Sequence, residues 1–316
     1  YWNTSNVTDM SGMFEDANDF NQPLNTWNTS NVNTMRYMFA DAINFNQPLN
    51  KWNTSNVNTM RSMFNQAINF NQSLNNWDTS NVNNMRSMFE DANDFNQPLN
   101  DWDTSNVRNM GGIFNGAQSF NGDITGWDTS NVITMSFMFY DAYRFNQPLN
   151  HWNTSIVITM RSMFYNAYRF NQPLNDWNTS NVRNMKAMFY GANDFNQDIT
   201  NWYVCDNLVN NAENMFCDAT TWLENYVRRD GCDSDYNGPA NDWTPKYLNG
   251  TFIYRTDTTI NSVSDLPIIN DNGGFINLDY QIDGNEGSDG RKRVEVDYKW
   301  DTTCLLYTSD AADETE

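Results

Sequence analysis

The chain of 316 residues is 39% hydrophobic and 18% charged, and its formal net charge is −21 at pH 7. Such a negative field repels nucleic acid and anionic membrane surfaces, so no nucleic-acid partner is expected. No apolar run approaches the roughly 18 residues that a membrane-spanning helix needs, so direct membrane insertion is not expected either.

Residues 1–201 are predicted to form one domain, because one 25-residue unit recurs there in eight copies without insertion or deletion. The unit reads W-[ND]-T-S-N-V-x-x-M-x-x-M-F-x-x-A-x-x-F-N-Q-P-L-N-x, and the copies are numbered here from the one that begins at Trp2. A fixed period of about 20 to 50 residues predicts stacked units, each of which buries its apolar face against its neighbours. Since the chain begins inside a repeat and without a methionine, we expect its natural start to lie upstream.

Each copy is predicted to contain one helix and one strand. In the second copy, the apolar residues from Val32 to Ala42 recur at the spacing of one helix face, which predicts a helix of about three turns. Ser30 or one of its neighbours is the expected N-cap. The following N-Q-P-L-N-x-W segment is expected to be extended, because its proline cannot continue a helix. The predicted fold class is therefore an α/β repeat solenoid with one short parallel strand and one short helix per 25 residues.

One asparagine column occupies the same turn position in every copy. Its side chains can bond the backbone of the neighbouring copy, so an asparagine ladder is favoured over a polar binding strip. The column consists of Asn21, Asn46, Asn71, Asn96, Asn121, Asn146, Asn171 and Asn196.

A threonine column near the start of each copy allows two interpretations. With the serine that follows, it can cap a helix; alternatively, its regular spacing can form an ice-binding surface. The asparagine before it completes a formal glycosylation sequon, but it alternates with aspartate, which favours a turn role. The column consists of Thr4, Thr29, Thr54, Thr79, Thr104, Thr129, Thr154 and Thr179.

Copies six to eight carry aromatic and basic residues where the other copies are mostly polar. Tyrosine and arginine dominate interface hot spots, so these residues are the candidate ligand-binding site. The alternative is that the tyrosines merely stack and stiffen the wall. Phe137, Ile133 and Ile158 lie in the same stretch. The candidate site residues are Tyr140, Tyr143, Tyr165, Tyr168, Tyr190, Arg144 and Arg169.

The repeated unit closely resembles the tandem repeat of BspA-like leucine-rich-repeat surface proteins, over about two thirds of the chain. The segments Phe120–Trp127 and Asn196–Trp202 are also similar to the F-N-x-D-[IL]-[ST]-x-W pattern of that family. The resemblance implies a leucine-rich-repeat-like solenoid on bacterial and some protist surfaces, with adhesion or host-matrix binding as its role. It implies no catalytic residues and no fixed ligand residues.

Residues 202–250 are predicted to be a degenerate ninth copy with a cysteine-containing cap or linker, since the open end of a stacked core must be covered. Eight copies without cysteine are followed by Cys205, Cys217 and Cys232. This cluster suggests a stapled cap in an oxidising compartment, with Cys205 and Cys217 as the disulfide candidate. Free buried cysteines are the alternative.

A candidate calcium loop follows the ninth copy. Asp233, Asp235 and Asn237 match the first half of an EF-hand loop, but Thr244 stands where the bidentate glutamate belongs. The segment is thus either a weak calcium loop or an acidic solvated turn, and no other cofactor is expected.

Residues 251–303 are predicted to be a truncated β-domain. Apolar and polar residues alternate in 276–282 and again in 294–300, and the glycine-rich stretch between them is typical of a hairpin. Residues 304–316 contain CLLYTSDAADE, which looks like the translation of a sequencing adaptor and is expected not to be natural protein.

The function expected from these features is that of a non-catalytic repeat protein outside the cell or on its surface. His151 is the sole histidine, and the sequence offers no catalytic set, no metal-ligand spacing and no phosphate loop. We expect an adhesin or scaffold that binds a protein or glycan on a host or neighbouring cell. The alternatives are an ice-binding or purely structural surface solenoid and, with least support, an enzyme.

Overall fold

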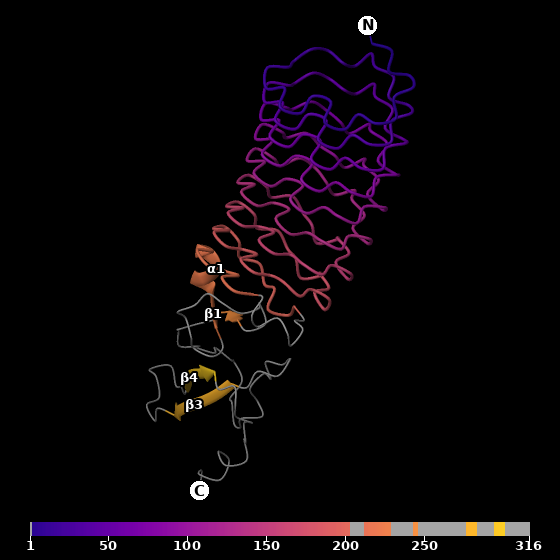
Figure 1. The fold of residues 1–316 in the computed structure, drawn as a ribbon. Coiled ribbons are helices and arrows are strands. Elements are labelled where there is room, and N and C mark those ends of the chain that lie inside the picture. Colours follow the sequence, from indigo (N-terminus) through magenta and orange to yellow (C-terminus); the bar gives the residue numbers. More distant parts are fainter. Residues whose placement is uncertain (1, 203–211, 229–242, 246–275, 283–293, 301–316) are drawn as a thin grey trace. The chain divides into compact units, whose positions relative to one another are not determined.

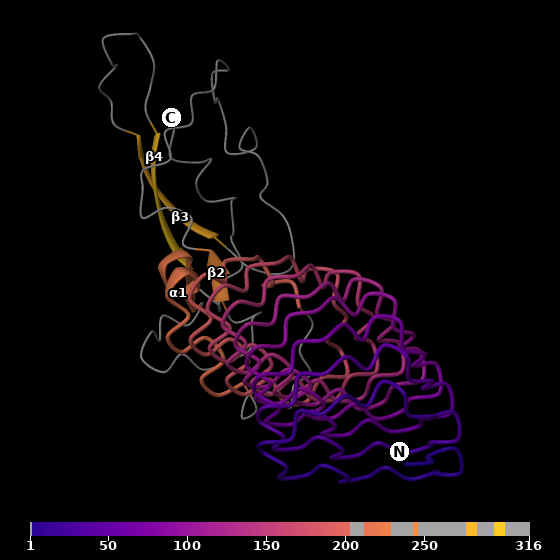
Figure 2. The same ribbon diagram turned by 90° about the horizontal axis from the view of Figure 1, so that it is seen from above.

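The computed structural model describes five segments of the chain: residues 2–202, 212–228, 243–245, 276–282 and 294–300. They fall into two compact units, the first of which contains the eight copies and the ninth copy up to residue 224. Within this unit the copies lie one above another, from the indigo N-terminal copy to the orange ninth copy (Figure 1). Figure 2 views the same stack after a turn of 90°.

Backbone hydrogen bonds between neighbouring copies hold the stack together. In the second copy, every other amide from Met35 to Asp41 donates to a carbonyl of the third copy. The amide of Met35 bonds the carbonyl of Thr59 at 3.2 Å, and the amide of Asp41 bonds that of Asn65 at 2.8 Å. The column just before Met35 forms a line of isolated parallel bridges through Asp9, Thr34, Thr59, Asn84, Asn109, Thr134, Thr159 and Asn184.

The helix predicted between Val32 and Ala42 is wrong. Residues 2–202 contain no α-helix. Two consecutive turns take its place: the amide of Met38 bonds the carbonyl of Met35 at 3.3 Å, and the amide of Ala42 bonds that of Phe39 at 3.2 Å. Ser30 consequently caps no helix.

The two turns explain why the apolar spacing suggested a helix. The third residue of each turn has a positive φ, 57° at Tyr37 and 60° at Asp41, as a type II turn requires. Each turn returns its first and fourth residues to the same side, so apolar residues recur at intervals of three and four, as they do on a helix face. The apolar spacing alone cannot distinguish an α-helix from two consecutive turns, whereas the hydrogen-bond partners of the amides can.

The parallel pairing also lies outside the predicted strand segment. It runs through the Thr34 column, inside the segment expected to be helical. Side chains instead join the N-Q-P-L-N segments of neighbouring copies, because the Asn21 carbonyl oxygen Oδ1 accepts from the Asn46 amide at 3.0 Å and from Gln47 Nε2 at 2.9 Å. The amide of each next asparagine in the column makes the same contact up to Asn196, which confirms the asparagine ladder.

The residue after each tryptophan has the predicted turn role. Asn28 Oδ1 accepts from the Ser30 amide at 3.1 Å, and Asp78 Oδ1 accepts from the Ser80 amide at 3.1 Å. Only the side-chain oxygen takes part in this bond. Asparagine and aspartate therefore exchange freely at this column.

Aromatic ladders fill the core. Phe39 stacks on Phe64 of the next copy with ring centroids 5.5 Å apart, and within its own copy it stacks on Phe45 at 4.1 Å. Trp52 stacks on Trp77 at 6.3 Å, and the Trp77 indole donates to the carbonyl of Leu49 at 3.1 Å. The predicted core register is confirmed by the burial of Trp77, Met85, Phe89 and Phe95.

The fifth copy ends in the variant segment F-N-G-D-I-T-G and approaches the fourth copy closely. A Cβ on Gly126 would lie 2.0 Å from the carbonyl oxygen of Asn100, so only glycine fits there. The Leu99 amide donates to the Asp123 carbonyl at 2.8 Å. The indole of Trp152, whose counterparts bond the carbonyl 28 residues earlier, has no acceptor among the described residues.

The ninth copy continues the core and ends in α1, Thr220–Asn225. Phe216 stacks on Phe189 at 5.7 Å, and Trp222 stacks on Phe195 at 5.7 Å. Trp222 thus takes the place of the second phenylalanine of the earlier copies. The degenerate copy keeps its apolar frame where the structure describes it.

The described part of the second unit contains two antiparallel strand pairs. Strand β1, Tyr226–Arg228, pairs with β2, Trp243–Pro245. Strand β3, Ile276–Ile282, pairs with β4, Val294–Trp300, in the register that sets Ile276 opposite Trp300. The predicted pair of alternating strands is therefore confirmed.

Replacing Phe89 with alanine tests the ladder core. Phe89 is fully buried and stacks on Phe64, Phe95 and Phe114. We expect a loss of about 3 to 5 kcal/mol in the free energy of unfolding, from lost transfer energy and the cavity. Denaturant unfolding measures it, with Arg86→Ala on the exposed wall as the control. A loss below about 1 kcal/mol would contradict the register.

Candidate functional site

Five tyrosines in copies six to eight form the candidate site and are called the tyrosine ladder: Tyr140, Tyr143, Tyr165, Tyr168 and Tyr190. Tyr140, Tyr165 and Tyr190 each follow a buried phenylalanine of the turn segment, so their side chains lie on the outer side of the wall. Tyr143 and Tyr168 follow the buried alanine column in the same way. The inward columns thus fix the position of both tyrosine columns.

The tyrosines stack on one another along the array. Tyr165 lies between Tyr140 and Tyr190, with ring centroids 4.5 Å away on both sides and interplanar angles of 9° and 8°. Tyr143 and Tyr168 stack at 4.9 Å. Stacking, one of the two interpretations from the sequence, is therefore observed. It stabilises the wall, so we expect replacement of the tyrosines to lower the stability of these copies while the recurring columns still hold the stack together.

The stacking decides which part of the central ring, Tyr165, can meet a ligand. Both faces of Tyr165 are covered by its neighbours. The negative face is the part of an aromatic ring that attracts cations and C–H groups. Tyr165, at the centre of the ladder, therefore presents its ring edge and hydroxyl group outward, which suit hydrogen bonding and edge packing.

Arg144 and Arg169 directly follow the second tyrosine column, and both are exposed. Neither forms an ion pair or a cation–π contact with any residue that the structure describes. Arg161, by contrast, lies 5.4 Å from the ring centroid of Phe137, which is itself 6.0 Å from Tyr140. Aromatic rings and cations therefore share this wall.

The ladder ends at Cys217 of the ninth copy, whose carbonyl accepts from the Gly191 amide at 2.8 Å. The pKa of Tyr190 lies above its ordinary value, first because its hydroxyl is hydrogen-bonded to Asp218 and second because of the nearby Cys217. Partial burial, followed by the charge of Asp218, raises the pKa of the Cys217 thiol. A raised thiol pKa keeps cysteine protonated and unreactive at neutral pH.

Several predicted sites lie wholly or partly outside the described residues. Cys217 carries a free thiol, but its predicted partner Cys205 is not described, so the disulfide stays a prediction. The candidate calcium residues Asp233, Asp235 and Asn237 are not described either. Within the described segments, no three His, Cys, Asp or Glu side chains gather in a way that could hold a metal ion.

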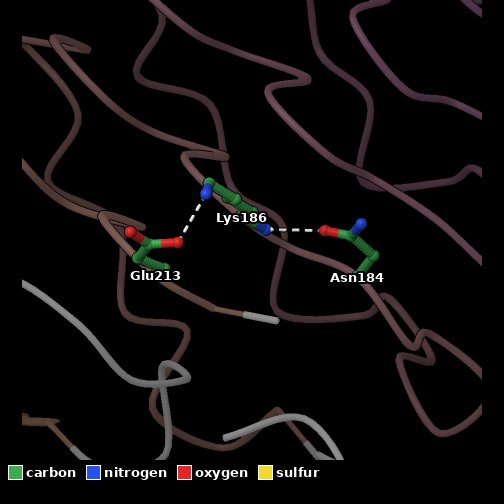
Figure 3. A network of polar contacts seen from close by, with 3 residues as sticks. All are labelled: Asn184, Lys186 and Glu213. Carbon is green, nitrogen blue, oxygen red and sulfur yellow. Dashed lines mark hydrogen bonds and ion pairs between the residues drawn. The ribbon is translucent and has the colours of Figure 1, made fainter. Parts of the chain in front are cut away.

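One ion pair links the eighth and ninth copies, the only one among the residues that the structure describes. The Lys186 ammonium group pairs with the Glu213 carboxylate, while the Lys186 amide donates to Asn184 Oδ1 at 3.0 Å (Figure 3). Both charged side chains are substantially exposed, and such pairs contribute little to stability. This network therefore joins the eighth and ninth copies, and we do not count it as a binding site.

The ice-binding interpretation of the threonine column is wrong. Thr29, Thr54 and their equivalents are buried, with at most 4% of each residue exposed. The Thr29 hydroxyl donates to the carbonyl of Asn53 in the next copy at 2.9 Å. The threonine column therefore joins neighbouring copies through buried hydrogen bonds and exposes no surface to which ice could bind.

The structure adds one surface residue that the sequence analysis did not single out. Ile156 is 41% exposed, beside the expected Ile133 and Ile158. It stands in a column that is asparagine in every other copy. That departure from an otherwise invariant polar column is the signal that could have revealed it.

The substitution Tyr165→Asn tests how much ring stacking contributes to stability, and Tyr168→Asn is the variant with which it is compared. Tyr165 loses two stacking contacts and Tyr168 loses one, and each is worth about 0.5 to 1.5 kcal/mol. Both variants install the asparagine that other copies carry at these columns, as in Asn65 and Asn93. Denaturant unfolding should show the larger loss for Tyr165→Asn. Equal or negligible losses would mean that stacking contributes nothing.

Comparison with known proteins identifies a family. The family model described as "Mycoplasma protein of unknown function, DUF285" matches four overlapping segments, residues 1–97, 49–146, 70–167 and 121–228. No curated protein and no solved structure matches the chain. Among the described residues, no helix has the length and apolarity to span a bilayer. The matches run from residue 1 to residue 228, so the chain belongs to the DUF285 family of tandem-repeat proteins.

Proposed function

We propose that this chain is a non-catalytic solenoid scaffold on the cell surface and that the tyrosine ladder is its binding face. The single observation that carries the proposal is the confinement of the ladder to copies six to eight, while the columns that hold the stack together recur in all eight copies. Folding requires the recurring columns. The outer columns are free to vary and to carry recognition.

The polar copies support this division of roles. The Tyr140 column holds Glu15, Asn65 and Glu90 in earlier copies, which stack with the same backbone bonds. Tyrosine is thus not needed at this column for a copy to take its place. Its presence in three consecutive copies gives the wall a continuous aromatic edge with arginines beside it.

The covered faces of the central ring, Tyr165, favour a protein ligand over a glycan. Sugars approach aromatic rings with their C–H groups over the face, and the faces of Tyr165 are occupied by its neighbours. Ring edges, hydroxyls and the exposed guanidinium groups of Arg144 and Arg169 match a partner that offers backbone carbonyls and carboxylates. The proposed ligand is therefore a protein on a host or neighbouring cell.

The proposed location outside the cell rests on two features. The repeat resembles that of BspA-like surface proteins, and the strongly acidic composition favours solubility in an extracellular medium. The proposal includes no cofactor and no catalytic step.

Adhesion of the purified protein tests the proposal. Wild type and a variant with Tyr140, Tyr143, Tyr165 and Tyr168 all replaced by asparagine are compared on immobilised extracellular-matrix proteins and on a glycan panel. We expect wild type to bind a matrix protein and the variant to lose at least tenfold in affinity, because the aromatic hot-spot edges are gone.

The matched control is Ile43→Asn with Ile68→Asn, which changes the Tyr143 column in the second and third copies. It should bind like wild type. Thermal unfolding of each variant separates loss of binding from loss of folding. If the folded variant that lacks the four tyrosines adheres as well as wild type, the ladder is a purely structural stack and the proposal is contradicted.

A further inference from the structure

We propose that a second surface of the array, formed by Ile133, Ile156, Ile158, Arg108 and Arg183 and called here the isoleucine–arginine column, docks an extended acidic peptide segment. The segment has the pattern acidic–x–apolar–x–acidic and runs along the stack. This surface uses other columns than the tyrosine ladder, and the inference does not rest on the function proposed for that ladder.

The isoleucines are exposed and lie where other copies are polar. Ile133, Ile156 and Ile158 are 40%, 41% and 46% exposed, and within the described part of the chain only Trp2 and Tyr168 are other large hydrophobic side chains so open to solvent. Copies two to four carry asparagine in the Ile133 column. The array therefore stacks without these isoleucines.

Ile156 also gives up a hydrogen bond that the rest of the array makes. In its column Asn131 Nδ2 donates to the carbonyl of Ser105 at 2.8 Å, and Asn181 Nδ2 donates to that of Ser155 at 2.6 Å. An isoleucine cannot donate this bond. A side chain that interrupts a ladder of stabilising hydrogen bonds and exposes apolar area points to a use outside the fold.

Two arginines bracket the isoleucines in one line. The Ile133 amide bonds the carbonyl of Arg108 at 3.0 Å, the Ile158 amide bonds that of Ile133 at 2.9 Å, and the Arg183 amide bonds that of Ile158 at 2.8 Å. The four residues therefore occupy the same position in four consecutive copies. Arg108 and Arg183 are exposed, and neither forms an ion pair with any described residue.

The spacing of this line selects the geometry of the partner. Parallel bridged copies advance by about 4.8 Å, so three steps separate the two arginine backbones by about 14 Å. An extended chain rises about 3.4 Å per residue, so residues i and i+4 also lie about 14 Å apart, with residue i+2 on the same face between them. Carboxylates at i and i+4 then meet the arginines, while an apolar side chain at i+2 meets the isoleucines.

Isoleucine-methyl NMR of the full chain, titrated with defined peptides up to millimolar concentration, tests this inference. The probes are the capped peptides TETVTET, its uncharged counterpart TQTVTQT and TTEVETT, in which the carboxylates are two residues apart. We expect TETVTET to shift the methyl signals of Ile133, Ile156 and Ile158 but not those of Ile43 and Ile68. The other two peptides should bind at least fivefold more weakly.

Two variants use residues that the array itself carries in these columns. Arg108→Asn with Arg183→Asn should weaken TETVTET at least fivefold and remove its preference over TQTVTQT. A variant that combines Ile133→Asn, Ile156→Asn and Ile158→Asn should not bind the peptide. Its melting temperature should equal or exceed that of wild type, because asparagine at position 156 can again donate to the serine carbonyl of the preceding copy.

Three results would overturn the inference. The first is absence of methyl shifts with TETVTET at millimolar concentration. The second is equal binding of all three peptides, and the third is unfolding of the triple asparagine variant, which would make the isoleucines structural. Adhesion through the tyrosine ladder is measured separately and can fail or succeed independently.

Discussion

The hydrogen bonds from alternate amides of one copy to carbonyls of the next are the constraint on which the whole array depends. Because these bonds leave the copy that makes them, a single copy cannot satisfy its own backbone, and buried amides without partners are costly. Each copy must therefore advance by the same step as its neighbour. That common step brings like residues into contact and produces the ladders of phenylalanine, tryptophan, asparagine and threonine.

The same constraint separates residues that hold the stack from residues that can change. Each residue of an inward column or of the asparagine ladder contacts the equivalent residues of the preceding and following copies. A substitution in one copy therefore disturbs both neighbouring copies. Outward columns tolerate substitution, as the exchange of Glu90 for Tyr140 two copies later illustrates. Both proposed binding surfaces lie in such outward columns, over a few consecutive copies.

Much of this organisation could be predicted from the sequence, because a strict period fixes which residues meet. The core columns, the asparagine ladder, the turn role of Asn28 and the strand pair β3–β4 followed from it. The local structure of the Val32–Ala42 segment could not be predicted, because two consecutive turns at Tyr37 and Asp41 give the apolar spacing of a helix without its hydrogen bonds. The burial of the threonines did not follow either, because only the stacked backbone reveals their carbonyl partners. Nor did the Trp152 indole, which has no acceptor among the described residues.

The hydrogen-bond partner of one amide tests the central claim most directly. The Phe64 amide donates to the carbonyl of Met88 in the next copy at 2.8 Å, whereas a helix would direct it to Met60. Scalar coupling across the hydrogen bond, measured by NMR between the Phe64 amide nitrogen and carbonyl carbons, identifies the acceptor. Coupling to Met88 is the predicted result, and coupling to Met60 would contradict a stack held by bonds between copies.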